Sequence, residues 1–380
     1  MVAARFSSRG AMKQGESTGV VVIGGGIVGC SVAYYLGKLG GKCTIVEQDT
    51  VAGHSSGFAL GGLNPLGVPG PLNNLSLDSF RLHQGLSESL KEETGIDTEF
   101  ELHTSLVLAY SELEAHAMQL GLTLLGNQEG FTAEWKNNTD ILAIEPRLAG
   151  GLLGGIVIQY VGLVEPYKLA LGFLQAAEKM GSHMRHGTVT GLKFDSDRVT
   201  AVLVGNEEIP CDTVVLAMGA WSRDAANWIG MDIPTSPLKG QILRLRVPGP
   251  PMTYVSWGHN YAVTKPDDLV WVGTTEEDMG FDETPTLEAR KWIMESVVEV
   301  LPHLMDAQLV RQTACLRPAT PDNLPFLGKT FGKEGVIIAT GGGRKGIHLS
   351  PIMGKIVADL VVKGNTSYDI SSIDPCRGMS

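Results

Sequence analysis

Hydrophobic and polar positions follow a regular pattern from residue 19 onward. Residues 19–23 are β-branched and small, as in a buried strand, and residues 27–39 have the apolar spacing of a helix. A pair of glycines ends that helix, and residues 42–47 return to a strand. Three consecutive glycines join the first strand to the helix. The pattern therefore predicts a strand–helix–strand unit with a tight first turn.

The same patterns predict further elements along the chain. One expected helix contains residues 80–94, and the others are residues 111–125, 165–180, 287–301 and 352–362. Expected strands are residues 188–193, 199–204, 213–218 and 335–340, with strand-rich stretches at 100–158 and 237–273. The glycine-rich stretch 53–71 is too irregular for a connector and is expected to line a ligand, while 341–351 is expected to be a loop. Alternating helices and strands indicate an α/β protein.

The glycines of the first turn have the spacing Gly24-x-Gly26-x-x-Gly29. The first permits the turn, the second lets backbone amides approach a pyrophosphate, and the third lets helix and strand pack closely. Ile27 and Val28 begin the helix, whose N-terminus favours phosphate. A lone motif of this kind is often a plain turn. Here the flanking strand and helix favour a dinucleotide site.

Glu47 ends the second strand, where a carboxylate accepts ribose hydroxyls in such sites. An acid there also repels a 2′-phosphate, so NADP is disfavoured. The choice between NAD and FAD rests on the other end of the chain, where Gly341, Gly342 and Gly343 lead into another helix. Nicotinamide dehydrogenases rarely have a second glycine loop at the C-terminus. A helix N-terminus at this loop could stabilise negative charge on a reduced flavin. FAD is therefore favoured.

Composition narrows the range of partners. The chain has 380 residues and a formal net charge of -11, which argues against nucleic acid. No stretch approaches the roughly 20 apolar residues of a membrane span. Five scattered cysteines without CxxC spacing fit a reducing compartment and indicate no metal site. We expect a cytoplasmic protein in which residues 1–18 are a disordered tail, with a basic organellar transit peptide as the alternative.

Eight segments, in order, carry a resemblance to a known family. They are VVVIGGGIVGCSVAYYL at the first turn, Ser55-Ser56, EP at 145–146, VEPYKL at 164–169, AMGAWS at 217–222, PLKGQ at 237–241, LRPATPDNLPFLG at 316–328 and ATGGGRKGIHLSPIMG at 339–354. In these segments the chain resembles the D-amino acid oxidase or glycine oxidase (DAO) group of FAD-dependent amine oxidoreductases. The likeness is greatest to glycine oxidases and extends over nearly the whole chain.

The order of segments and this resemblance together imply two interleaved domains. A Rossmann-like FAD-binding domain of the glutathione-reductase type would comprise residues 19–80, 160–222 and 320–380. An α+β substrate-binding domain, built on a mostly antiparallel sheet, would comprise residues 81–159 and 223–319. Contacts with FAD are expected from Gly24, Gly26, Ile27, Val28, Gly29, Glu47, Gln48, Ser55, Ser56, Gly61, Val189, Gly219, Trp221, Gly343, Arg344, Lys345, Gly346, Ile347 and His348.

The resemblance also assigns residues to the substrate. Arg317 would bind a substrate carboxylate, Tyr261 would assist, and Arg344 would close the site. A guanidinium offers two parallel donors to a carboxylate, and a phenol adds one in an apolar pocket. His348 would line the pocket, or act only within its loop. The alternatives are a structural salt bridge for Arg317, a sheet aromatic for Tyr261 and a solvated loop side chain for Arg344.

Two residues bear on the flavin itself. Sarcosine oxidases of the same superfamily carry a lysine that promotes oxygen reactivity, and Trp271 takes its place here; glycine oxidases also lack that lysine. Cys315 falls where sarcosine oxidases attach flavin covalently. The neighbouring sequence resembles glycine oxidase, which favours non-covalent FAD over a covalent link at Cys315.

The implied activity is oxidation of the C–N bond of a small amino acid or N-methyl amino acid, of the glycine, sarcosine or D-amino acid type. Hydride would pass to flavin N5, the imine would hydrolyse to an oxo acid, and O2 would reoxidise the flavin, giving H2O2. One open alternative is a proline, sarcosine or 2-hydroxy-acid dehydrogenase that passes electrons to a quinone or carrier protein. Another is a non-catalytic flavin-binding assembly protein. A homo-oligomer is compatible with the sequence.

Overall fold

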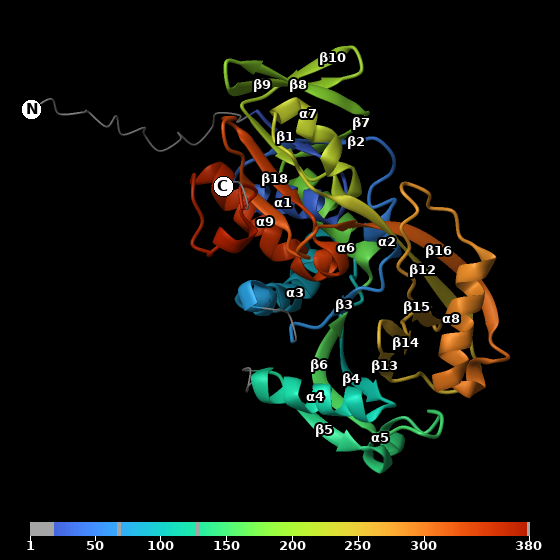
Figure 1. Ribbon diagram of the computed structural model, residues 1–380. Helices are drawn as coiled ribbons and strands as arrows, with labels where there is room; N and C mark the ends of the chain where they lie inside the picture. Colours follow the sequence, from blue (N-terminus) through green and yellow to red (C-terminus); the bar gives the residue numbers. More distant parts are fainter. Residues whose placement is uncertain (1–18, 67–69, 126–129, 378–380) are drawn as a thin grey trace, which may run out of the picture.

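The computed structural model describes residues 19–66, 70–125 and 130–377, so the tail predicted at 1–18 lies outside the described residues. A six-stranded sheet forms one end of the molecule (Figure 1). Its order is β17 (Phe326–Lys329), β18 (Val336–Thr340), β11 (Thr213–Leu216), β1 (Val20–Ile23), β2 (Cys43–Glu47) and β7 (His183–His186). The last five strands pair in parallel and β17 is antiparallel. The fold is thus a mixed α/β fold with a Rossmann-like parallel sheet.

Both faces of this sheet are covered, which explains its nearly uninterrupted apolar strands. On one face, Val20 and Val22 pack with α1 (Ile27–Lys38), α3 (Asn73–Thr94), α6 (Pro166–Lys179) and α9 (Gly346–Val362). On the other, Val21 and Ile23 pack with a three-stranded sheet of β8 (Val189–Asp195), β9 (Arg198–Val204) and β10 (Glu207–Pro210). Two further helices, α2 (Ser55–Phe58) and α7 (Ala226–Ile229), are short.

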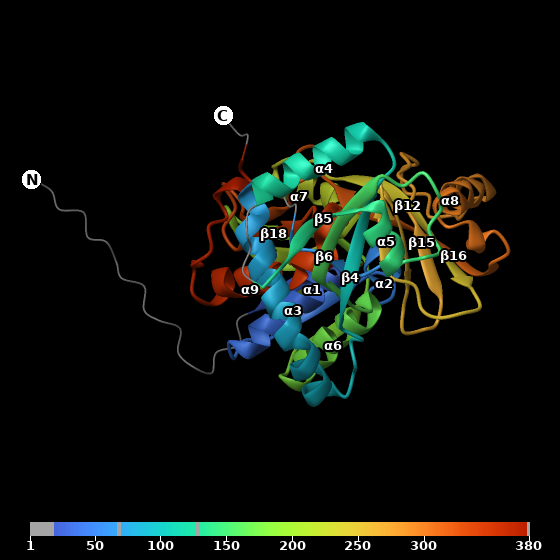
Figure 2. The same ribbon diagram turned by 90° about the horizontal axis from the view of Figure 1, so that it is seen from below.

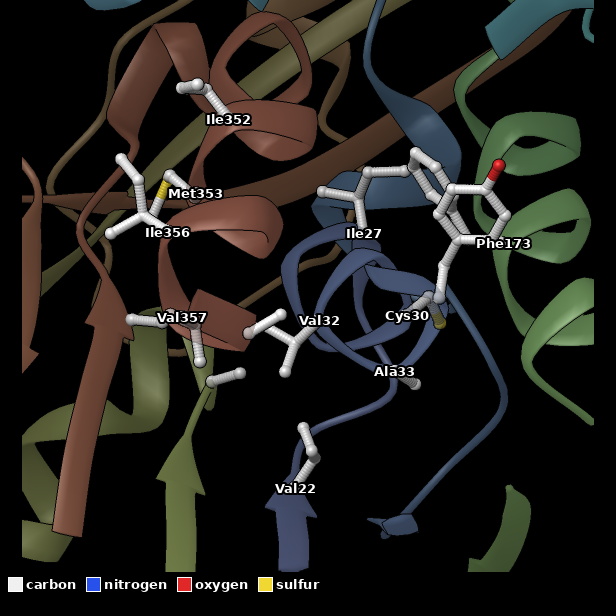
Figure 3. Close-up of a cluster of buried hydrophobic side chains, with 14 of the residues drawn as sticks. Val22, Ile27, Cys30, Val32, Ala33, Phe173, Ile352, Met353, Ile356 and Val357 are labelled. Atoms are coloured by element: carbon white, nitrogen blue, oxygen red, sulfur yellow. The ribbon is translucent and has the colours of Figure 1, made fainter. Parts of the chain in front are cut away.

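Helices α1 and α9 lie against each other although they come from opposite ends of the chain (Figure 3). A Cβ on Gly354 of α9 would lie 2.2 Å from Ser31 Oγ of α1, so only glycine permits this approach. Ser31 Oγ donates a hydrogen bond to the Ser350 carbonyl at 2.8 Å. The first turn of the chain and its last glycine loop are therefore held side by side.

A nine-stranded sheet extends away from this region (Figure 1). Its strands, in order, are β16 (Gln308–Ala319), β12 (Ser236–Arg246), β15 (Val270–Gly273), β14 (Asn260–Thr264), β13 (Tyr254–Trp257), β4 (Glu101–Ala109), β6 (Gly154–Leu163) and β3 (Gly62–Leu63), with β5 (Ala133–Asn137) paired to β6. All pairs are antiparallel except β13 with β4. Helix α8 (Leu287–Val300) covers one part, while α4 (Glu112–Leu125) and α5 (Asn138–Ile144) pack on β5 and β6 (Figure 2).

Several predicted bounds were wrong. Strands β3, β7, β10, β16 and β17 were not predicted. Helix α3 contains the predicted helical residues 80–94 and begins earlier, at Asn73. Helix α9 begins at Gly346, inside the segment expected to be a loop, and includes Pro351. Proline cannot donate to the Ile347 carbonyl, but Ser350 Oγ at 2.9 Å and His83 Nε2 at 3.2 Å do so instead. The predicted domain boundaries stay a prediction.

Candidate functional site

The first turn is built so that only glycine fits at two of its positions. Gly24 has a φ of +107°, and a Cβ there would lie 2.3 Å from the Ala217 carbonyl oxygen. A Cβ on Gly29 would lie 2.0 Å from the Gly24 carbonyl oxygen. At Gly26 the nearest atom to such a Cβ is Ser56 Oγ at 3.3 Å, and this glycine faces a cavity instead of the core. Gly24 and Gly29 therefore maintain the turn, and Gly26 leaves space for a ligand.

Glu47 organises the same turn from the end of β2. One carboxylate oxygen accepts from the Gly25 amide at 2.6 Å and the other from the Asp49 amide at 2.8 Å. The Ile27 amide, expected to face a phosphate, donates instead to Ser56 Oγ at 2.9 Å. The N-terminus of α1 is thus partly capped by the glycine-rich segment that follows β2.

Two cavities lie end to end along these residues. The first, of about 110 Å³, is lined by residues that include Gly24, Gly26, Glu47, Gln48, Ser55, Ser56, Val189, Gly219 and Trp221. The second, of about 370 Å³, is lined by residues that include Gly26, Ile27, Val28, Ser55, Ser56, Gly61, Gly219, Tyr261, Arg317, Gly343, Arg344, Lys345, Gly346 and Ile347. Gly26, Ser55, Ser56, Ala217 and Gly219 line both. The chain of cavities, with a helix N-terminus beside it, fits an extended dinucleotide such as FAD.

Arg317 extends from β16 into the second cavity. It donates to Thr274 Oγ1 at 2.7 Å and to the Thr275 carbonyl at 3.2 Å. Its guanidinium lies over Gly240 of the neighbouring strand β12, where a Cβ would come within 2.3 Å of both terminal nitrogens. Burial lowers the pKa of Arg317, and within the described residues no carboxylate lies close enough to form a salt bridge with it. The structural salt bridge considered as its alternative role is therefore absent from that part of the chain.

Two tyrosines and one cysteine also line the second cavity beside Arg317. Neither the Tyr261 nor the Tyr254 hydroxyl has a hydrogen-bond partner among the described residues, and both side chains line the second cavity. Burial raises the pKa of Tyr261 far above its usual value and that of Tyr254 to about 12, so both remain protonated donors. Burial also raises the pKa of Cys315 to about 11, which disfavours the reactive thiolate.

The last glycine loop presents two further cations. Arg344 Nε donates to a Glu276 carboxylate oxygen at 2.6 Å, and both side chains are partly exposed. Lys345 Nζ donates to the Asn64 carbonyl at 3.2 Å. Arg344 is therefore ion-paired at the cavity. It is not a free, solvated arginine, and not all of its donors are available to bind a substrate.

His348 and Trp271 lie elsewhere. His348 is buried between α9 and α3, with Nε2 2.7 Å from Ser76 Oγ and 3.0 Å from the Ser76 carbonyl, and it does not line either cavity. Burial lowers the pKa of His348 well below its usual value. Two cations lie over the ring of Trp271, Arg244 at 3.7 Å and Lys265 at 4.6 Å from its centroid. Trp271 also lines neither cavity.

Sequence reasoning missed several residues around Arg317. Tyr254, Thr274, Thr275 and Glu276 come from strands or loops distant in sequence, and no motif marks them. Gly240 lies in PLKGQ, which was noted only as part of the resemblance. Among the described residues, no group of His, Cys, Asp and Glu could hold a metal ion, and no helix is long and apolar enough to cross a membrane.

The chain is similar to known proteins in both sequence and structure. A glycine oxidase from Geobacillus kaustophilus (strain HTA426) is 30% identical over 365 residues, which cover 94% of this chain and 96% of that protein. The crystal structure of glycine oxidase from Geobacillus kaustophilus matches with a TM-score of 0.91 and 29% identity, covering 96% of this chain and 99% of that one. The crystal structure of iminodiacetate oxidase from Chelativorans sp. BNC1 matches with a TM-score of 0.86 and 26% identity, covering 94% and 98%.

The family model described as FAD dependent oxidoreductase matches residues 19–360. That range contains the first turn, the cavity wall at Arg317 and the last glycine loop. Because the match includes both ends of the double cavity, the chain belongs to the FAD dependent oxidoreductase family and is an FAD-dependent enzyme.

Proposed function

We propose that this enzyme oxidises the C–N bond of a small amino acid or N-methyl amino acid to an imine. The electrons pass to O2, giving H2O2, and water converts the imine to the oxo acid. The observation that carries the proposal is Arg317, a half-buried arginine whose guanidinium faces the cavity without an acidic partner among the described residues. Similarity to glycine oxidases and to an iminodiacetate oxidase supports this class of substrate. An assembly protein without turnover has no need of such a group.

Arg317 can bind the substrate carboxylate through two parallel hydrogen bonds. Thr274 and Thr275 hold the guanidinium in place, so little side-chain freedom is lost when the carboxylate binds. The Tyr261 hydroxyl, protonated at any physiological pH, is available as an additional donor. Fixing the carboxylate fixes the Cα–H bond relative to the rest of the cavity, and such positioning is a large part of catalysis.

The charges of the cavity also select the form of the amine. Arg317, Arg344 and Lys345 line the second cavity, and no Asp or Glu does so among the described residues. Cations near a bound amine lower its pKa, so the neutral amine is favoured over the ammonium ion. The neutral form has the lone pair that helps expel a hydride from Cα. Bound FAD would supply the hydride acceptor, and Gly24, Gly26, Glu47 and Ser56 line the first cavity, which would hold the nucleotide part of FAD.

The proposal is tested with purified holoenzyme and a panel of glycine, sarcosine, D-alanine, D-proline and a 2-hydroxy acid. We expect at least one amine to bleach the flavin absorbance without air and to yield H2O2 in air. Bleaching without peroxide would identify a dehydrogenase, and bleaching by the hydroxy acid alone would overturn the choice of substrate class.

Arg317→Lys provides the matched variant. It keeps the charge but loses the planar fork, so KM for the best amino acid should rise by about a hundredfold, on the order of 2–3 kcal/mol. An unchanged KM would show that Arg317 does not bind the carboxylate.

A further inference from the structure

The stretch PLKGQ at residues 237–241 lies in strand β12, and its two faces have different surroundings. A Cβ on Gly240 would lie 2.3 Å from both terminal nitrogens of Arg317, so Gly240 faces the guanidinium. Side chains alternate between the two faces of a strand, and Lys239 and Gln241 therefore point to the opposite face. Both are fully buried there, and neither lines a cavity. Gln241 is thus separated from the second cavity by its own strand.

Gln241 has a hydrogen-bond partner for every polar position of its side chain. Its Nε2 donates to a Glu277 carboxylate oxygen at 2.9 Å and to Thr286 Oγ1 at 3.2 Å. Its Oε1 accepts from the Thr286 amide at 3.0 Å and from Gln312 Nε2 at 2.9 Å. A primary amide has two donor hydrogens and two acceptor lone pairs, and all four are used here. The amide therefore fixes Glu277 and the start of α8 relative to β12.

The contacts of Gln241 continue to Arg317 through one further residue. Thr275 Oγ1 donates to Glu277 at 2.5 Å and accepts from the Gln241 main-chain amide at 2.9 Å. The Thr275 carbonyl accepts from Arg317 at 3.2 Å, and the hydroxyl of the preceding Thr274 accepts from Arg317 at 2.7 Å. The orientation of the guanidinium therefore depends on Thr274 and Thr275, and the orientation of Thr275 depends on Gln241 and Glu277.

The segment that contains Thr275 is also attached to β12 by its main chain. The Lys239 amide donates to the Glu277 carbonyl at 3.0 Å, and the Glu277 amide donates to the Lys239 carbonyl at 2.9 Å. Lys239 Nζ adds an ion pair with Asp282 at 2.9 Å. These contacts do not involve the Gln241 side chain, so the segment should stay on β12 without it. The side-chain amide of Gln241 instead orients the Glu277 carboxylate and, through it, Thr275.

We propose that Gln241 is a positioning residue for the substrate carboxylate, because it acts through Glu277 and Thr275 to hold the Arg317 guanidinium in the orientation that receives that carboxylate. This inference rests on the proposed function. An arginine that is already held in place loses little freedom when its ligand binds. Loosening it should therefore weaken carboxylate binding more than it slows the reaction of substrate that is already bound.

Steady-state kinetics of the holoenzyme with the best amino acid test this role. Gln241→Leu should raise KM about tenfold, the size expected for one lost hydrogen bond, and change kcat by less than about twofold. Thr275→Val removes the hydroxyl but keeps the carbonyl that accepts from Arg317; it should have the same effect and decides the test if Gln241→Leu does not fold. Unchanged KM, or a loss confined to kcat and Tm, would overturn the positioning role.

Ser182→Ala is the control for simple loss of stability. Its buried hydroxyl accepts from the Cys43 amide at 3.1 Å, and Ser182 lines neither cavity. This variant should lower Tm and leave KM unchanged. A rise in KM equal to that of Gln241→Leu would show that destabilisation alone accounts for the effect, which would also overturn the proposal.

A double-mutant cycle tests whether Gln241 acts through Arg317. In the Arg317→Lys background the planar fork is already lost, so adding Gln241→Leu, or Thr275→Val in its place, should raise KM by less than about twofold more. A further tenfold rise would contradict action through Arg317.

A crystal structure of the Gln241→Leu holoenzyme, or of Thr275→Val, separates this inference from the proposed function. The Arg317 guanidinium should lose its contact with the Thr275 carbonyl. If this displacement is found but the unaltered enzyme oxidises no amine, the proposed function fails and the control of Arg317 by Gln241 stands. If an amine is oxidised with a KM that depends on Arg317, and both variants leave KM and the guanidinium unchanged, only the positioning role fails.

Discussion

Gly240 is the residue whose replacement tests the position of the Arg317 guanidinium. Strands β12 and β16 pair so that Gly240 lies opposite Cys315, and Arg317 is two residues farther along on the same face. A Cβ at residue 240 would lie 2.3 Å from both terminal nitrogens of Arg317 and 2.4 Å from Cζ. We therefore predict that Gly240→Ala displaces the guanidinium from its present position.

The size of the effect follows from these distances. Ordinary contacts between heavy atoms are about 3.5–4.0 Å, so the guanidinium must move by on the order of 1 Å. A misplacement of about 1 Å can reduce the rate by about a hundredfold, equivalent to roughly 2.7 kcal/mol. The fold should change little, because the displaced atoms are the end of a side chain at a cavity and Gly240 does not have a positive φ.

The assay compares kcat/KM for the best amino acid, the Kd of a carboxylate inhibitor and the Tm of each holoenzyme. Gly240→Ala should lose about a hundredfold in kcat/KM, weaken the inhibitor and keep nearly the same Tm. Gly85→Ala on α3 is the matched control because a Cβ there meets nothing within 4 Å; it should leave the kinetics unchanged and add roughly 1 kcal/mol of stability. If Gly240→Ala retains normal kinetics, Arg317 is not held as the structure shows or does not bind the substrate.

Other parts of the site make predictions of their own. His54 Nδ1 lies 2.7 Å from a Glu283 oxygen, and that hydrogen bond raises the pKa of His54 from 6.5 to about 9. Because the pKa of His54 is higher in the folded protein, the pair stabilises the fold below about pH 6.5 and loses its contribution as pH rises through about 9. The Tm of the unaltered protein should therefore exceed that of His54→Asn at low pH, and this difference should disappear over that range. A difference that grows with pH would refute the role of the pair. Gly29→Ala should prevent folding or cost several kcal/mol, on the order of 3 or more, whereas Gly26→Ala should fold and bind FAD more weakly by equilibrium titration; equal behaviour of the two variants would contradict their separate roles. The Cys315 thiol, with its pKa raised to about 11, should not be attached to flavin, so acid precipitation should leave all the yellow colour in the supernatant, and colour in the pellet would refute this.

The sequence predicts those elements whose formation depends on residues that lie close together in the chain. The β1–α1–β2 unit could be recognised because the valine run, the glycine spacing and Glu47 lie within one short stretch. The polar strand β7, with the sequence HMRH, could not, because it exists only through its pairing with β2 at the sheet edge. Long β16 was missed for a similar reason: its first half is largely exposed and does not alternate, and its register is set by β12.

The site shows the same division. The resemblance placed Arg317 and Tyr261 near each other, and the structure brings both to one cavity, although their roles stay a prediction. The contact of Arg317 with Gly240 could not be derived, because it depends on the register between two strands distant in sequence. His348, for which a role within its loop was the alternative to lining the pocket, lines neither cavity, because α9 begins earlier than expected and this start directs its ring toward Ser76 of α3.

The central claim is that Arg317 binds the carboxylate of an amino acid beside bound FAD. A crystal structure of the holoenzyme with glycolate, an analogue of glycine without the amine, tests it most directly. The predicted result is a carboxylate with both oxygens on the Arg317 guanidinium and a hydrogen bond from Tyr261, in the cavity that also contains the flavin ring. Glycolate bound elsewhere, with Arg317 still directed only at Thr274 and Thr275, would contradict the claim.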